Sequence, residues 1–282
     1  MGLKMSKITD RLFDNAYLET ADVQGSLPPL ELHKGKDAVV EYASQHNISR
    51  ASSEQLYSTI VNAPKWLPYS SSIYHTSANV KDYFTVPTII MPTDLPNRNG
   101  TAFPLTELAK FDPEIGNHAY MGWIGKPVYI EHDNLDYTKA IGAVVDVAMR
   151  KIDNANGGLY KVIALMAIDR TKNPKIANDI LSGRRRNYSM GAMVKAYQCS
   201  ICGAKGFIRS GLRNKFEALA CGTQHAAFDR QGKFRTVPLT ANSQERTLGF
   251  LNAIGVKPFE ISTVGYPAFA SAYTPEYRIA NM

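Results

Sequence analysis

The pattern of hydrophobic and polar positions changes near residue 83 of this 282-residue chain. The preceding part is polar, rich in Ser and Tyr and only weakly periodic, with short helices predicted over 37–46 and 52–61. We therefore interpret residues 1–80 as an N-terminal extension or propeptide. Beyond it, apolar runs bounded by Pro, Gly and Asn are typical of β-strands.

The apolar runs after residue 83 predict a series of strands. Two of them are joined by the residues Asp-Asn-Ala-Asn-Gly-Gly, which have the turn chemistry of a β-hairpin. Another strand carries Ser189. The remaining predicted strands are 83–92, a short strand ending near His132, the hairpin strands 140–152 and 160–170, and a final strand beginning at Lys257.

One helix has signals at both of its ends. Asn173 can cap its first turn, Pro174 suits the first helical position, and Gly183 can end it. Its apolar stripe consists of Ile176, Ala177, Ile180 and Leu181. A shorter helix is predicted to open at Pro104.

Many strands with few helices favour a β-rich α+β fold, a barrel or sandwich with helices packed outside. A hydrophobic content of 44% suffices for one large domain or two small ones. No run approaches 18 consecutive apolar residues, so we expect no membrane span. The first residues lack the apolar region of a secretory signal, and three cysteines favour a reducing interior over a disulfide framework.

The net charge of +7 is unevenly distributed. Residues 184–236 contain eleven basic and two acidic side chains, and the rest of the chain is slightly acidic. Such a segment indicates an acidic partner or substrate, or else a solvated surface. Nucleic acid is the less favoured partner, because the segment lacks an aromatic stacking platform and a recognisable groove-reading helix.

The cysteines and one histidine have the spacing of a metal site. Cys199 and Cys202 are separated by two residues, and Cys221 is followed by His225 after three more. Two such pairs suit a tetrahedral zinc ion, and four protein ligands leave no open position, which indicates a structural ion. We therefore interpret 199–236 as a basic zinc-binding insertion; the alternative is two reduced thiols and an unrelated histidine.

Three polar residues on different predicted strands suit nucleophilic catalysis. His132 lies at the end of one strand, Ser189 on a later one, and Glu260 on the final one. If all three face one cleft, the carboxylate can orient the imidazole and the imidazole can take the serine proton. Gly191 would let a substrate backbone approach, and backbone N–H groups near it could hold an oxyanion.

An ordered set of short motifs resembles the procapsid (prohead) maturation proteases of tailed bacteriophages, which are similar in fold to the herpesvirus assemblins. The motifs are "NRNGTAFPLTEL", "GKPVYIEHDN", "ALMAIDRTKNPKIANDILSG" leading into "SMG", and "FEISTVGYPA". The resemblance covers roughly residues 83–275 and implies an assemblin-like protease domain formed by 81–198 and 237–282.

The resemblance also implies the roles of the site residues. The histidine after the "GKPV" strand is the base of that family, which matches His132, and the serine after the helix and glycine is the nucleophile, which matches Ser189. A late acidic residue is the third member in phage enzymes, which matches Glu260. Assemblins use a second histidine there, and Asp169 is the alternative acidic residue for this role.

The implied function is a serine endopeptidase in the host cytoplasm, inside the viral procapsid. Its partners are the scaffold and major capsid precursor proteins, and it also cleaves itself; homo-oligomerisation stays open. No cofactor is expected for catalysis. The alternative is a non-catalytic structural or scaffold protein of the phage particle with the same fold, although such a protein has no reason to keep all three triad residues.

The family often cleaves after an acidic residue, which raises the question of what binds the substrate carboxylate. Arg185 is our candidate among Arg184, Arg185 and Arg186, because strand alternation would turn it toward the face of Ser189. The alternative is that all three arginines cap the preceding helix and face solvent. The segment Leu-Thr-Glu-Leu at 105–108 is a candidate self-cleavage site.

Overall fold

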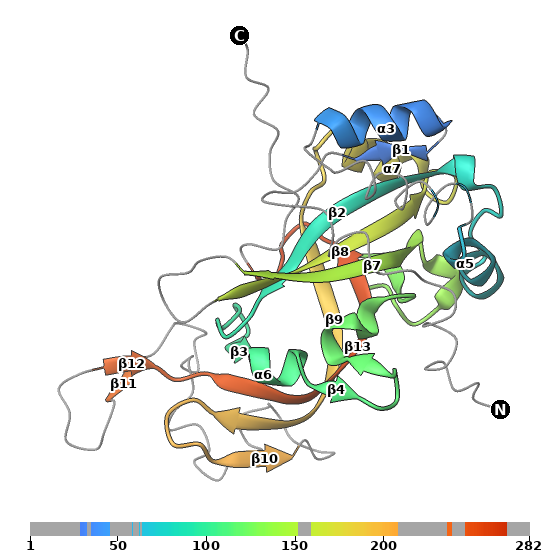
Figure 1. Ribbon diagram of the computed structural model, residues 1–282. Helices are drawn as coiled ribbons and strands as arrows, with labels where there is room; N and C mark the ends of the chain where they lie inside the picture. Colours follow the sequence, from blue (N-terminus) through green and yellow to red (C-terminus); the bar gives the residue numbers. More distant parts are fainter. Residues whose placement is uncertain are drawn as a thin grey trace.

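The computed structural model of the chain describes residues 29–32, 35–45, 64–151, 159–207, 236–238 and 246–269, together with positions 58 and 62. Figure 1 shows the arrangement of the elements. In chain order they are β1 (Leu30–Glu31), α3 (Gly35–Gln45), α5 (Trp66–Tyr74), η3 (Val80–Asp82), β2 (Tyr83–Pro92), β3 (Thr101–Ala102), α6 (Leu105–Leu108), β4 (Phe111–Asp112), β5 (Asn117–His118), η4 (Ala119–Trp123), β6 (Pro127–Ile130), η5 (Tyr137–Lys139), β7 (Gly142–Lys151), β8 (Tyr160–Asp169), α7 (Pro174–Leu181), β9 (Tyr188–Cys199), β10 (Lys205–Phe207), β11 (Thr236–Pro238), β12 (Arg246–Leu248) and β13 (Leu251–Thr263).

The described part of the chain is a β-rich mixed α+β fold built on one large sheet. Its strand order is β1-β2-β8-β7-β6-β13-β9-β10, and β3 also pairs with β13. Strand β8 runs antiparallel to both of its neighbours, β2 and β7, whereas β6 runs parallel to β13 and β9 antiparallel to it. Helix α5 contacts β7, and Figure 1 shows α3 above β1 at one end of the sheet.

Of the expected barrel or sandwich, a closed barrel is not present within the described residues. Closure requires the two terminal strands of a sheet to hydrogen-bond to each other. Here the terminal strands are β1 and β10, which are two and three residues long and pair only with β2 and β9. The expectation of a β-rich fold with flanking helices is confirmed, and the barrel is corrected to an open sheet.

The helix predicted from its end signals is α7. The Asn173 side chain accepts a hydrogen bond from the N–H of Ile176 at 3.1 Å, and Pro174 occupies the first helical position. Gly183, with φ of +72°, lies just past the helix, in the conformation that glycine adopts without steric strain. The helix leads directly into β9, which carries Ser189.

The core lies between the long strands and their covering segments. The β7–β8 hairpin is apolar on both faces along most of its length, so its strands are buried almost throughout. Trp66 and Tyr74 of α5 belong to the same core cluster, and the Tyr74 hydroxyl donates to the carbonyl of Gly125 at 2.6 Å. Residues 66–74 of the predicted N-terminal extension thus contribute to the core.

No helix in the described part of the chain is both long and apolar enough to cross a membrane.

Candidate functional site

The turn that follows β6 places His132. Strand β6 pairs in parallel with the end of β13, with Ile130 opposite Thr263. Glu131 and His132 then adopt left-handed conformations with φ of 51° and 59°, which are uncommon for residues other than glycine. The N–H of Glu131 donates to the Thr263 carbonyl at 3.0 Å, and the N–H of His132 donates to the Ser262 hydroxyl at 3.2 Å. The end of β13 therefore holds this turn in place.

Glu260 is fully buried, and its two oxygens have different partners. His132 Nδ1 lies 2.8 Å from Oε1, and the Ser262 hydroxyl donates to Oε2 at 2.6 Å. An Nδ1–H that donates to a carboxylate leaves Nε2 of the neutral imidazole as the acceptor, which is the arrangement of an oriented base. The hydrogen bond to Glu260 raises the pKa of His132, burial opposes the rise, and the charge of Glu131 adds to it.

Gly191 allows Glu260 to reach the histidine. It lies opposite Glu260 on the neighbouring strand, next to a β-bulge between Pro258 and Glu260. A Cβ atom at Gly191 would collide with Glu260 Oε1 and would lie 2.7 Å from the ring of Phe259. A side chain at this position would therefore displace the carboxylate from His132.

Ser189 reaches the same site through the register of β9. It lies opposite Ser262 of β13, and residues directly opposite in a sheet project to the same face. Its exposed fraction is 6%, and it lines, together with His132, a cavity of about 230 Å³. Among the described residues no hydrogen bond joins Ser189 to His132; the structure shows an imidazole bonded to Glu260 and a serine that lines the same cavity. Catalytic hydrogen bonds are often long before substrate binds.

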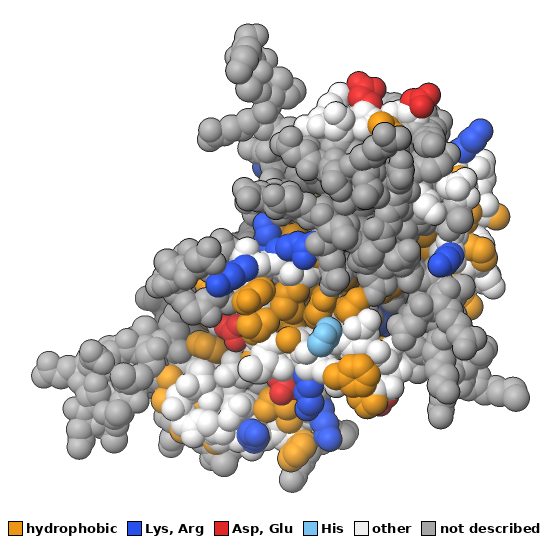
Figure 2. Space-filling model, viewed as in Figure 1, with side chains coloured by type: hydrophobic (Ala, Val, Ile, Leu, Met, Phe, Trp, Pro, Cys, Tyr) orange, Lys and Arg blue, Asp and Glu red, His pale blue; other side chains and the backbone are white. Residues whose placement is uncertain are grey.

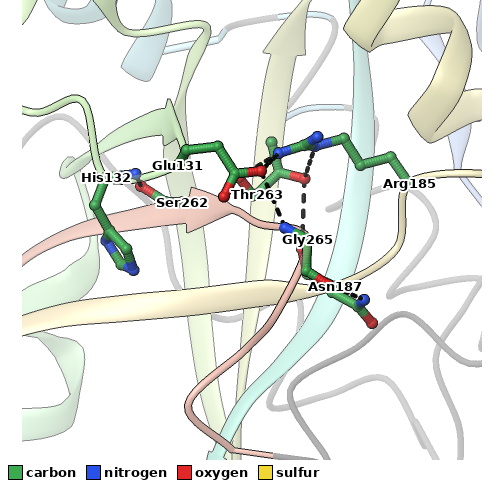
Figure 3. A network of polar contacts seen from close by, with 7 residues as sticks. All are labelled: Glu131, His132, Arg185, Asn187, Ser262, Thr263 and Gly265. Atoms are coloured by element: carbon green, nitrogen blue, oxygen red, sulfur yellow. Dashed lines mark hydrogen bonds and ion pairs between the residues drawn. The ribbon is translucent and has the colours of Figure 1, made fainter.

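Arg185 belongs to a polar network behind the histidine turn (Figure 3). Its guanidinium pairs with Glu131 and donates to the Thr263 hydroxyl at 2.8 Å and to the Thr263 carbonyl at 2.9 Å. Glu131 also accepts from the N–H of Gly265 at 3.0 Å. The network connects the segment before Ser189 to the turn that carries His132. Arg185 does not line the cavity, so its role in binding substrate stays a prediction.

Arg184 has the position that the helix-capping alternative described. Its guanidinium pairs with Asp179 of α7 at 2.7 Å, and its side chain is largely exposed. The N–H of Arg185 donates to the Asp179 carbonyl at 2.9 Å, which closes the end of the helix. Arg184 therefore faces solvent beside the helix, as that alternative described for all three arginines, whereas the guanidinium of Arg185 turns toward Glu131.

The other acidic candidate, Asp169, lies at the end of β8 and is also buried. It accepts hydrogen bonds from Ser77 and Thr171, not from His132. Ser262 was not anticipated from the sequence, although it binds both Glu260 and His132. Its position two residues after Glu260 in the same strand was the available signal, since alternate strand residues share a face.

The predicted zinc site lies only partly within the described residues. Cys199 is buried at the end of β9, and Cys202 is exposed in the turn before β10. Cys221 and His225 lie outside the described residues. The described part of the chain contains no group of three or more metal-ligating side chains. The four-ligand zinc site therefore stays a prediction.

The candidate self-cleavage segment forms α6. Leu108 is buried in the core, and Glu107 accepts a hydrogen bond from the N–H of Gly255 at 2.9 Å. A peptide bond inside a packed helical turn must first be exposed before a protease can cleave it. This segment is therefore protected from cleavage in the folded chain.

Comparison of the chain with protein-family models, with curated proteins and with solved structures finds no match.

Proposed function

We propose that this protein is a serine endopeptidase in which Ser189 is the nucleophile, His132 the general base and Glu260 the residue that orients the base. One observation carries the proposal: a buried carboxylate lies 2.8 Å from Nδ1 of a half-exposed imidazole, and that imidazole and Ser189 line one cavity. Retention of this set is hard to explain in a purely structural protein, because a buried carboxylate needs a partner but does not need an imidazole that reaches solvent.

The chemistry follows from the arrangement. A substrate carbonyl in the cavity is attacked by the Ser189 hydroxyl while Nε2 of His132 takes its proton. Glu260 stabilises the resulting imidazolium, and the same imidazole then returns the proton to the leaving amine. Water, activated by His132, hydrolyses the acyl-enzyme. Closure of the Ser189–His132 hydrogen bond on substrate binding completes the arrangement.

The resemblance of the motifs to phage prohead proteases supports a biological setting for this activity. In the proposal the enzyme acts inside the procapsid in the host cytoplasm, on the scaffold and major capsid precursor proteins and on itself. The proposal includes a structural zinc ion held by Cys199, Cys202, Cys221 and His225, which takes no part in hydrolysis.

The test compares the wild type with Ser189→Ala over time. The wild type should react with a fluorophosphonate, which labels activated serines, and should shorten itself, as followed by intact mass. Ser189→Ala should do neither, and Ser72→Ala, on an exposed position of α5, should behave as the wild type. A wild type that is neither labelled nor shortened, and that cleaves no peptide, would contradict the proposal and favour a non-catalytic particle protein.

A further inference from the structure

The cavity at Ser189 and His132 is lined by apolar residues and by uncharged polar ones. It extends from these two residues along β9, where Met190, Ala192 and Val194 line it. Figure 2 shows hydrophobic side chains gathered at the middle of the displayed face, with a histidine at their border. Because Ser189 itself lines the cavity, a side chain that fills it belongs to a residue next to the bond being cleaved.

The wall of the cavity is preformed. The rings of Phe103 and Phe269 pack against each other with centroids 6.2 Å apart, and both are buried. Beside them, the side chain of Asn97 accepts from the N–H of Asn99 at 2.9 Å and from the N–H of Thr101 at 3.1 Å, which closes a tight loop. Its oxygen is thereby occupied within its own loop.

Arg98 links this loop to Pro267 and Ala268, and its guanidinium is not part of the cavity lining. Its N–H donates to the carbonyl of Ala268, and its guanidinium donates to the carbonyl of Pro267, both at 2.9 Å. The guanidinium also lies 3.8 Å from the ring centroid of Tyr266. The arginine thus joins the two loops that form the wall, while its neighbours Asn97 and Asn99 face the cavity.

The described lining contains no carboxylate, lysine or arginine; its ionisable side chains are His132 and Tyr197. Tyr197 is neutral, since burial raises the pKa of its hydroxyl further. His132 must be neutral to act as a base. We propose that this cavity is the primary specificity pocket, which binds a neutral side chain next to the scissile bond and rejects carboxylates and ammonium groups. The proposal rests on the proposed function.

The physical reason is desolvation. An apolar side chain gains by leaving water for a wall of Phe, Met, Val and Ala side chains. A charged side chain loses its hydration on entering, and no described lining residue offers a fixed opposite charge. This specificity differs from the acidic preference that the sequence suggested, because Arg185 is paired with Glu131 outside the cavity.

The test maps the bonds that the wild type cleaves in a mixture of proteome-derived peptides, by mass spectrometry. At one of the two positions flanking the cleaved bond, charged residues should be depleted by roughly tenfold relative to neutral ones. Val194→Asp places a carboxylate in the cavity and should shift that position toward Lys and Arg by a similar factor. Met193→Asp, on the neighbouring, exposed residue outside the cavity, should leave the profile unchanged.

A second variant protects the test against misfolding. If the circular dichroism spectrum shows that Val194→Asp is unfolded, Ala192→Leu is used instead. Its larger side chain narrows the cavity, so the variant should favour Gly and Ala at the same position. Wild-type enrichment of acidic residues next to the cleaved bond, or an equal response of the two aspartate variants, would overturn the proposal. A wild type that cleaves peptides without discriminating against charged residues contradicts this inference alone. A wild type that cleaves none contradicts the proposed function itself.

Discussion

Glu260 and Asp169 are both buried acids, with exposed fractions of 0% and 1%, but their surroundings differ. Asp169 accepts from the N–H of Ser77 at 2.6 Å and from the N–H and hydroxyl of Thr171 at 2.8 and 2.6 Å. Its partners therefore close one turn and join β8 to the segment before β2. One carboxylate oxygen of Glu260 accepts a hydrogen bond from the Ser262 hydroxyl. The other contacts the imidazole of His132, whose side chain is 42% exposed.

The difference shows which buried acid can take part in chemistry. Backbone N–H groups and a threonine hydroxyl hold a carboxylate but cannot exchange a proton with a substrate near neutral pH. An imidazole can, and here it extends from a buried carboxylate to a cavity that contains Ser189. Burial of an acid is therefore not sufficient as a sign of function; the identity and exposure of its partner decide.

The roles of the two buried acids can be tested by removing the charge of Glu260 and of Asp169 separately. Glu260→Gln should lower kcat by roughly 10³–10⁴-fold, because the amide no longer stabilises the imidazolium. Asp169→Asn should leave kcat unchanged. It should lower the free energy of unfolding by about 1–3 kcal/mol, because the NH2 group of the new amide cannot accept the hydrogen bonds that Ser77 and Thr171 donate to the carboxylate. Peptide hydrolysis and urea unfolding measure the two effects. Loss of activity in folded Asp169→Asn, with Glu260→Gln active, would reverse the assignment.

The pH dependence provides a readout from the same two variants. His132 acts as a base only when neutral, so wild-type kcat/KM should rise with pH through a pKa above the ordinary value of about 6.5. The Glu260 hydrogen bond is the main cause of the raised pKa, so any residual activity of Glu260→Gln should rise at lower pH. Asp169→Asn should keep the wild-type profile, and an unchanged profile in Glu260→Gln would contradict the hydrogen bond.

Arg185 affects the same site indirectly, because its pairing with Glu131 holds the turn that brings His132 to Glu260. Arg185→Ala should lower kcat/KM by roughly tenfold, since a small displacement of the base slows proton transfer. The loss should be equal on two peptides that differ only in Glu against Gln at the cleaved position. Arg185→Lys should recover part of the activity by restoring a charge beside Glu131.

Arg184→Ala is the matched control for Arg185, because it lies on the same linker but pairs with Asp179 of α7. It should retain wild-type kcat/KM on both peptides. If Arg185→Ala lost activity on the Glu peptide alone, the guanidinium would read a substrate carboxylate, as the sequence suggested, and its pairing with Glu131 would have to open during binding.

Metal removal should have the smallest effect on the chemistry. In the proposal the zinc ion stabilises the insertion and is absent from the proton path between Ser189 and Glu260. A chelator should therefore lower the thermal unfolding midpoint, and hydrolysis measured below that temperature should persist. Elemental analysis of protein purified without chelator should find one zinc per chain. Prompt and reversible loss of activity with folding unchanged would mean that the metal acts in catalysis.

The features that local sequence predicted well depend on neighbours a few residues apart. The helix after Asn173 and the strand at 83–92 appear with the bounds that their end signals indicated. Caps, proline at a first turn and alternating apolar residues act within one or two turns of chain, so they can be read directly. The barrel that the strand pattern also allowed is not closed among the described residues, because closure depends on pairing between the ends of the sheet, which no local pattern encodes.

The residue types available for chemistry are evident from the sequence, and its motifs indicate His132, Ser189 and Glu260 as the candidates. Only the tertiary structure decided that Glu260 rather than Asp169 contacts His132, that Ser262 joins them, and that Arg185 pairs with Glu131. These contacts depend on the register of β13 against β9 and β6 and on the bulge before Glu260. A shift of one residue reverses which side chains share a face, so contacts between distant strands are set only when the whole sheet has formed.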